Sequence, residues 1–235
     1  MGIVKGLKAI NQHIEAEEAR FSGGNSDAPK TKWFKLEDKQ AVKVIFLQEL
    51  DSNSEKYSLK NDLGFVATEH VSPHDFKIKA LCSIEDGHCY GCEQHEKDYS
   101  AGWKQRSRLY INVLVDDGIN EPYVAVLSQG TSAKSITPIL REYAGMGPIS
   151  DKWYRIKREG KGLSDTSYML MPLAAHDKNV EDYELYDLLK VVRQVPYEEQ
   201  ATFYNRGVAE SEPESGLNEF SGRSAPTQNS VNSEW

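Results

Sequence analysis

The stretch Arg108–Asp117, RLYINVLVDD, decides the fold of this chain. It is rich in β-forming residues, and strand geometry places every second side chain on the same face. One face then carries a continuous apolar row that is suited to a core, made of Leu109, Ile111, Val113 and Val115. The turn Gly118–Glu121 and the following Pro122–Ser128, PYVAVLS, predict an antiparallel hairpin partner.

Further strands are predicted on both sides of this hairpin. A hairpin of two strands joined by a polar turn is expected over 33–36 and 41–47, a third strand over 64–71, and a fourth over 76–82. Two more strands surround a glycine-rich loop within 152–173, and one helix is expected over 132–145, between Ser132 as cap and Gly145 as stop. This order predicts a mainly β protein, an OB-fold-like antiparallel barrel, with a β-sandwich as the alternative.

The flanking segments differ in composition from this core. Residues 1–24 are predicted to be a helical arm with the start of a linker, because Ile3, Leu7, Ile10 and Ile14 recur at helical spacing. The core then covers 25–175, with a zinc subdomain at about 66–102. Helices are expected over 179–195 and from Pro196 within a C-terminal region 176–206, followed by a disordered acidic tail over 207–235.

Charge is unevenly distributed along the chain. The net charge of the 235 residues is −8, yet residues 103–168 hold ten Lys and Arg against seven Asp and Glu. Residues 169–235 hold five against twelve. A basic middle beside an acidic end is informative about partners. The chain has no apolar run long enough to span a membrane and no secretory leader, so a soluble protein in a reducing compartment is expected.

All three cysteines lie close together, at Cys82, Cys89 and Cys92. In a reducing compartment such a cluster favours a metal site over disulfides, and the Cys89–Cys92 spacing is the C-x-x-C turn that grips one ion. Tetrahedral zinc needs a fourth donor. The candidates are His70, His74, His88 and His95, of which His88 is sterically poor because it adjoins Cys89.

A structural zinc ion is expected here rather than a catalytic one. Catalytic zinc sites keep three protein ligands and a water, and the H-x-E signature of zinc deaminases is absent near the cluster. The loop Cys82–Gly102 is polar and buries little apolar area, so metal binding would supply its folding energy.

Aromatic and basic residues alternate on three predicted strands. Lys104, Arg106, Arg108, Tyr110 and Asn112 share a face, next to Trp103; Trp153, Arg155 and Lys157 share another, followed by Arg158 and Lys161; Trp33 and Lys35 make the third set. Cations that follow a phosphate backbone beside stacking aromatics predict binding of single-stranded nucleic acid without sequence preference. No P-loop or G-x-S-x-G motif is present, and no enzymatic activity is expected.

The order of these features resembles the zinc-containing single-stranded DNA-binding proteins of bacteriophages, typified by the helix-destabilising protein of the T-even phages. The resemblance covers about residues 5–175 and is carried by WFKLEDKQAVKVIFL, by His70 with the three cysteines, by RSRLYINVLV and by WYRIKREG. The family's tail is longer and more acidic than the one found here.

The resemblance implies an OB-fold with one structural zinc ion bound by His70, Cys82, Cys89 and Cys92, with His74 next in line to His70. It also implies a protein that coats single-stranded DNA during replication, recombination and repair in the cytoplasm of a bacterial host cell. The arm would mediate self-association along the strand, and the tail would recruit replication proteins. The alternatives are an accessory subunit of a zinc-dependent nucleic-acid enzyme and an RNA-binding protein.

Overall fold

The computed structural model describes residues 31–162 and 165–206, so the predicted arm and acidic tail lie outside the described residues. Within this range the protein is mainly β, with one sheet of seven strands in the order β3-β2-β4-β1-β6-β7 and with β5 paired to β4. All of the ladders are antiparallel. The strands are β1 (Ala41–Phe46), β2 (Phe65–Val71), β3 (Lys79–Leu81), β4 (Arg106–Asp116), β5 (Tyr123–Gly130), β6 (Lys152–Glu159) and β7 (Ser167–Ala175).

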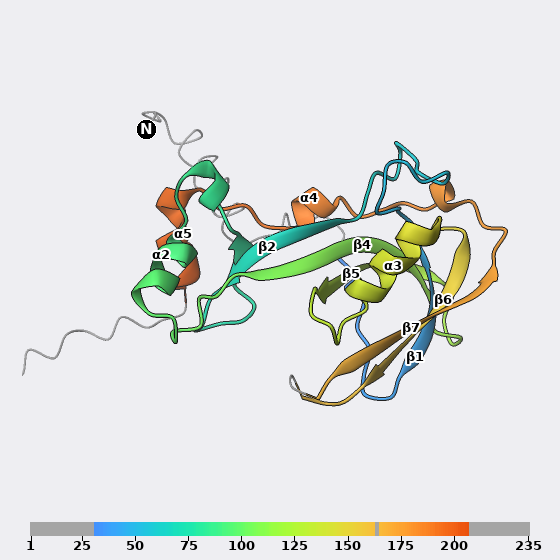
Figure 1. Cartoon of the computed structure of the whole chain (residues 1–235), viewed down its shortest axis with the longest axis horizontal. Coiled ribbons are helices and arrows are strands. Elements are labelled where there is room, and N and C mark those ends of the chain that lie inside the picture. Colours follow the sequence, from blue (N-terminus) through green and yellow to red (C-terminus); the bar gives the residue numbers. More distant parts are fainter. Residues whose placement is uncertain (1–30, 163–164, 207–235) are drawn as a thin grey trace, which may run out of the picture.

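The helices are short and lie mostly at the ends of the sheet. They are α2 (Tyr90–Lys97), α3 (Thr137–Met146), α4 (Leu188–Val191) and α5 (Tyr197–Tyr204), with 3-10 turns η1 (Ile84–Asp86) and η2 (Val180–Asp182). Figure 1 shows β2 and β4 running from the lobe formed by α3, β1, β6 and β7 to a smaller lobe that holds α2 and α5. We call the smaller one the cysteine lobe, residues 72–105 and 193–206. None of the helices in the described residues has the length and apolar character that a membrane crossing requires.

The central strand β4 confirms the prediction made for Arg108–Asp117. Its residues pair with β2, β1 and β5, and its odd-numbered side chains enter one core together with residues of α3. That core contains Leu109, Ile111, Val113 and Val115, as expected, packed with Ile136 and Leu140. We call this the inner face of the sheet. Even-numbered residues of β4 define the outer face.

Two strand predictions differ from the structure in the first half of the core. The segment around Trp33 does not form a hairpin with β1; it makes a parallel bridge to Val126 at the edge of β5. Its backbone is held there because Phe34 N–H donates to the Val126 carbonyl and Val126 N–H donates to the Lys32 carbonyl, both at 2.8 Å. The strand predicted over 76–82 is shorter than expected, since Phe76 lies in an exposed loop before β3.

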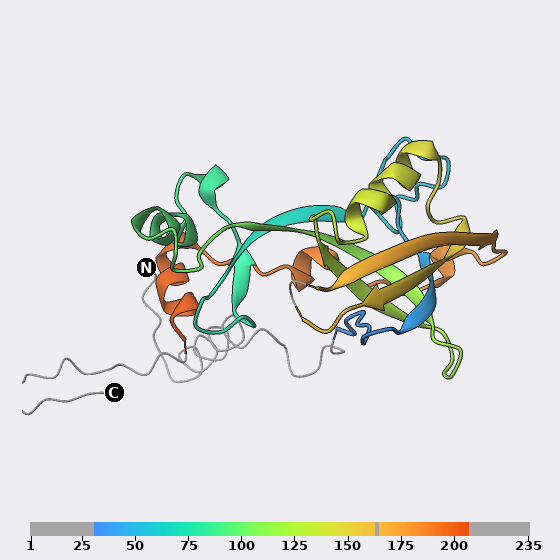
Figure 2. The same ribbon diagram turned by 60° about the horizontal axis from the view of Figure 1, so that its bottom comes forward.

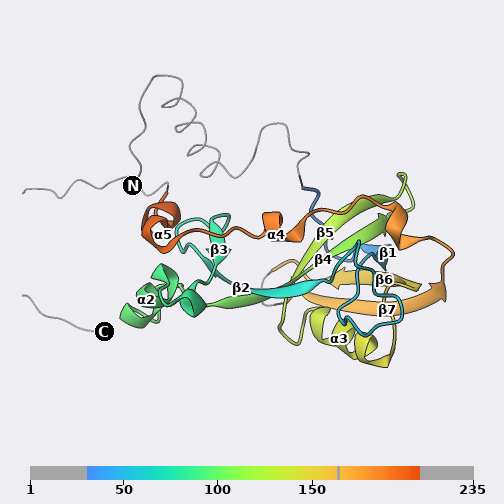
Figure 3. The same ribbon diagram turned by 90° about the horizontal axis from the view of Figure 1, so that it is seen from above.

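The helix predicted over 179–195 is also wrong. Only η2 and α4 are helical within it. Residues 176–192, which we call the strap, cross from β7 towards α5 and lie beside the sheet between the two lobes (Figure 3). The strap is extended at Tyr186 because the side chain of Asn112 forms hydrogen bonds with the backbone of this residue. The Asn112 amide accepts from the Tyr186 N–H at 3.1 Å and donates to the Tyr186 carbonyl at 3.0 Å. The helix from Pro196 is confirmed as α5, and the helix over 132–145 is confirmed in its second half as α3.

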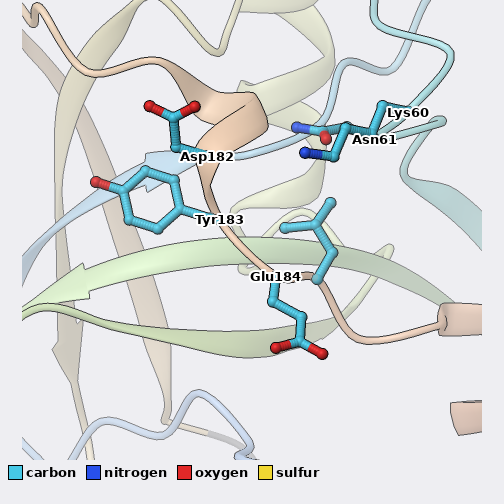
Figure 4. Close-up of a pocket in the computed structure, with 6 residues that line it drawn as sticks. Lys60, Asn61, Asp182, Tyr183 and Glu184 are labelled. Carbon is cyan, nitrogen blue, oxygen red and sulfur yellow. The ribbon is translucent and has the colours of Figure 1, made fainter.

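The strap covers the middle of the outer face. Leu188 and Val192 pack on Tyr110, and Tyr183 and Leu185 pack on a second apolar cluster that includes Trp153. Where the strap passes the loop before β2, a shallow pocket is lined by Lys60, Asn61 and Asp182 to Leu185 (Figure 4). This pocket contains none of the residues predicted to bind metal or nucleic acid. The finer expectation of a closed OB barrel stays a prediction, because no ladder joins β7 to β5 in the described residues.

Candidate metal centre and nucleic-acid interface

Four potential metal ligands converge where β2 meets the cysteine lobe. His70 comes from β2, Cys82 follows β3, and Cys89 and Cys92 lie at the start of α2. Their donor atoms all lie within 4.8 Å of one another. The separations are 3.8 Å from Cys82 Sγ to Cys89 Sγ, 3.5 Å from Cys82 Sγ to Cys92 Sγ, and 3.3 Å from His70 Nε2 to Cys92 Sγ.

These separations fit one tetrahedral ion. Zinc–sulfur bonds of about 2.3 Å and zinc–nitrogen bonds of about 2.0 Å place neighbouring donors about 3.5–3.8 Å apart at tetrahedral angles. A disulfide would need sulfur atoms about 2.05 Å apart, and all three cysteines are free. The cluster could therefore hold a metal ion, and its donor set is compatible with zinc.

A backbone carbonyl next to Nδ1 fixes the orientation of the His70 ring. Its Nδ1 lies 2.6 Å from the carbonyl oxygen of Trp103. A carbonyl can only accept, so Nδ1 carries a proton and Nε2 faces the cysteines, free to hold either a proton or a metal ion. A backbone carbonyl behind a histidine ligand is a usual means of setting its tautomer and ring direction.

Gly91 allows α2 to pass directly over the His70 ring. A Cβ at this position would lie 2.3 Å from His70 Cγ and 2.7 Å from Cδ2 and Nδ1. No side chain fits that space without a shift of the ring or the helix. The glycine inside the C-x-x-C turn thus brings Cys89 and Cys92 close to the histidine.

The surroundings of the three cysteines favour a thiolate at Cys89 and thiols at Cys82 and Cys92. Gln105 Nε2 donates to Cys82 Sγ at 3.1 Å and to Cys92 Sγ at 3.2 Å. Burial acts to raise the pKa of Cys89, but the interaction with His70 and backbone N–H groups outweighs burial and lowers the pKa to about 6. Burial is the main cause that raises the pKa of Cys82, and it is also the main cause that raises the pKa of Cys92 to about 12. One thiolate is therefore present near neutral pH, and the other two cysteines need a cation to deprotonate.

Of the four histidines considered, the structure brings only His70 into the cluster of the described residues. The ring of His88 lies against Tyr197, with centroids 5.3 Å apart, and that of His95 lies against Tyr99 at 4.9 Å. His74 is exposed in the loop after β2. No protein-family model, curated protein or solved structure matches the chain. The chemistry of the donor set and of the protein surface must therefore indicate the function.

The predicted aromatic residues are mostly covered. Tyr110 is 0% exposed and Trp103 is 5% exposed, so the expectation that either offers an open stacking face is wrong. Tyr110 lies under the strap, where it packs in one cluster with Leu188 and Val192. Trp103 packs edge-on against Tyr90 and Tyr204 in the cysteine lobe. Trp153 is half-buried beside the strap, whereas Trp33 is 38% exposed.

All of the predicted cations are exposed or half-buried. Lys35, Lys104, Arg106, Arg155 and Lys161 are exposed, and Arg108 and Lys157 are half-buried. Arg158 lies inside β6 rather than in the loop, and its guanidinium donates to the Leu36 carbonyl at 2.7 Å and to Thr166. Arg108 is held in a similar way, because its Nε and Nη2 donate to the hydroxyl and the carbonyl of Ser128 at 2.9 and 3.0 Å. The place of both arginines among the DNA contacts stays a prediction.

Strand pairing adds residues that the sequence did not reveal. Lys43 of β1 pairs with Arg155 of β6, and Arg155 and Lys157 pair with Met171 and Met169 of β7. Alternation within AVKVIF places Lys43 on a face, but only the register shows which neighbours share it. The two methionines are exposed and extend the basic surface with apolar contacts. In Figure 2 this part of the sheet, β6 and β7, lies at the opposite end of the molecule from α2 and α5.

Proposed function

We propose that this protein binds single-stranded DNA without sequence preference through the outer face of its sheet. The supporting observation is that five cations from three strands share this face in the ladder registers: Lys43, Arg106, Arg108, Arg155 and Lys157. The inner face is apolar. A cationic sheet surface with an exposed aromatic suits a flexible phosphate backbone with splayed bases.

The strap divides this surface into two parts. Arg106 and Arg108 lie towards the cysteine lobe, Lys43 and Arg155 lie towards β7, and covered residues separate them along β4 and β1. Burial of Leu188 and Val192 contributes about 3–6 kcal/mol, whereas stacking of one base contributes about 1–3 kcal/mol. A bound strand would therefore run beside the strap rather than displace it, and Tyr110 would stay covered.

The same proposal assigns a structural role to one zinc ion at the four-residue cluster. Four protein ligands leave no open position for a substrate or water, which is typical of structural zinc. When bound, the ion would neutralise the thiolates and supply folding energy to the cysteine lobe. Within the chain, His70 contacts the sulfur atom of Cys92, and Gln105 donates to the sulfur atoms of Cys82 and Cys92.

The wider role rests on the resemblance described above. It is a non-enzymatic coat for single strands in phage replication, recombination and repair, built on an OB-fold. Self-association through residues 1–24 and recruitment of replication proteins through the tail belong to the same proposal.

The test is the affinity for poly-dT compared with duplex DNA across a salt series. Preference for poly-dT, with log affinity falling linearly as log salt rises, is the expected result. Equal affinity for both, or binding to neither, would refute the proposed function. A poly-U arm separates DNA from RNA preference, because stacking and phosphate contacts alone do not read the sugar.

A further inference from the structure

Trp33 is the exposed aromatic residue of the outer face, and its ring is held on one side. The edge of Tyr110 meets it with centroids 6.5 Å apart and planes inclined at 65°. The ammonium group of Lys79 lies 5.7 Å from the ring centroid of Trp33 and 5.0 Å from that of Tyr110. Lys79 was not among the residues that the sequence indicated.

A buried carboxylate holds Lys79 in this place. Glu69 is 1% exposed, and both of its oxygens accept from Lys79 Nζ at 3.2 Å. The Tyr110 hydroxyl donates to Glu69 Oε1 at 2.7 Å and in turn accepts from Lys79 Nζ. Glu69 and its neighbour His70 point to opposite faces of β2, one to this cluster and the other to the metal ligands.

The ion pair makes Lys79 a poor phosphate contact. Its charge is balanced by Glu69 at contact distance, and a phosphate could take it only by leaving a buried carboxylate unpaired, which is unfavourable. The electrostatic attraction for phosphates near Trp33 then comes from Arg106 and Arg108. Lys79 instead holds one face of the Trp33 indole ring through a cation–π contact.

We propose that Glu69 is a positioning residue for nucleic-acid binding: it clamps Lys79 against one side of Trp33, so that the ring is held ready to stack a base. This inference rests on the proposed function, because stacking requires that a single strand binds the outer face. A ring that is already ordered loses less conformational entropy on binding. Loss of the clamp should therefore weaken binding without any change in the number of phosphate contacts.

Two other roles make different predictions. If Lys79 contacts a phosphate, its removal should lower the magnitude of the salt slope by about 0.7. If Glu69 only repels the DNA, its neutralisation should tighten binding. A positioning role instead predicts weaker binding in both variants with an unchanged slope.

The experiment measures oligothymidylate affinity across a salt series for Glu69→Gln and Lys79→Met. Glutamine retains an acceptor for the Tyr110 hydroxyl, and methionine retains the length of the lysine stem. Each variant should bind about three- to tenfold more weakly at every salt concentration, with the slope unchanged. The matched controls are Glu121→Gln and Lys97→Met, which change exposed residues outside β2 and β3. Tighter binding by Glu69→Gln, a slope change with Lys79→Met, or affinities equal to those of the controls would overturn the proposal.

Fluorine NMR of fluorotryptophan-labelled protein tests the clamp without DNA. The chain has four tryptophans, and Trp33→Phe assigns the signal of residue 33. Both clamp variants should shift or broaden that signal and leave those of Trp103 and Trp153 in place; an unmoved Trp33 signal would overturn the proposal even if no DNA binding is found. Absence of oligothymidylate binding by the unaltered protein would refute the proposed function instead. Should Glu69→Gln lose its metal or unfold, Lys79→Met and its Trp33 signal decide the outcome.

Discussion

Replacement of Gly91 by alanine should damage the metal centre specifically. The added Cβ would meet the His70 ring at 2.3 Å, and ordinary contact begins at 3.4 Å, so the ring or α2 must move by about 1.1 Å. His70 is fully buried, and its Nδ1 is held by the Trp103 carbonyl, so the ring has little freedom to yield. The added methyl group must then change the relative positions of the four donor atoms.

The expected magnitude follows from two sources. Overpacking in a buried region costs about 1–3 kcal/mol of stability. Misplacement of an orienting contact at a metal site lowers metal affinity by about 10–100-fold. Gly91→Ala should therefore bind zinc at least about tenfold more weakly in competition with a chelator, and its cobalt form should lose the spectrum of a tetrahedral thiolate site.

Gly145→Ala is the matched control. This glycine also lies in a helix, but a Cβ there would meet no atom within 4 Å. Alanine at this position should leave zinc affinity unchanged and stabilise the protein by up to about 1 kcal/mol. Unchanged zinc affinity and an unaltered cobalt spectrum in Gly91→Ala would refute the assignment of His70 as a ligand.

Three further outcomes are expected. Burial is the main cause that raises the pKa of Cys82, and the pKa of Cys92 is raised to about 12, so zinc must displace a proton from each thiol. Because two protons are displaced, zinc affinity should fall about 100-fold for each pH unit between about 8.5 and about 6.5, as measured by competition with a chelator. Asn112→Ala should lower the free energy of unfolding in urea by about 2–4 kcal/mol, because the backbone groups of Tyr186 lose their buried partner. Trp103→Phe should lower that free energy by about 1–3 kcal/mol and leave the affinity of the folded protein for oligothymidylate unchanged, since the ring is buried in the cysteine lobe.

Local patterns predicted the central strands and the three cysteines of the candidate metal cluster. Alternation in Arg108–Asp117 identified the core face, because a strand has a strict period of two. The C-x-x-C turn and a third cysteine identified the cluster, because few other arrangements use thiols in this way. The spacing of residues alone did not identify the fourth ligand. The hydrogen bond to the Trp103 carbonyl and the close approach of Gly91 place His70 at the cluster, and neither contact can be inferred from residue spacing.

The burial of a strand face by a segment far away in the sequence could not be predicted from local patterns. The face of Tyr110 seemed open because its own strand alternates cations with an aromatic, yet the strap covers it from about 75 positions further along the chain. The strap itself has the sequence pattern of a helix because Leu185, Leu188 and Val192 recur at helical spacing, but the side chain of Asn112 competes for its backbone hydrogen bonds. Glu69 and Lys79 were missed for a similar reason, since only the β2–β3 register brings them together.

The most direct test of the central claim is the salt dependence of oligothymidylate binding by a variant that lacks three cations of the outer face. Replacing Lys43, Arg155 and Lys157 by glutamine should lower the magnitude of the slope of log affinity against log salt by about 2, at about 0.7 for each lost contact. The control replaces three exposed lysines elsewhere, Lys56, Lys97 and Lys178, with the same loss of charge. An unchanged slope in the first variant, or an equal fall in both, would contradict binding through this face.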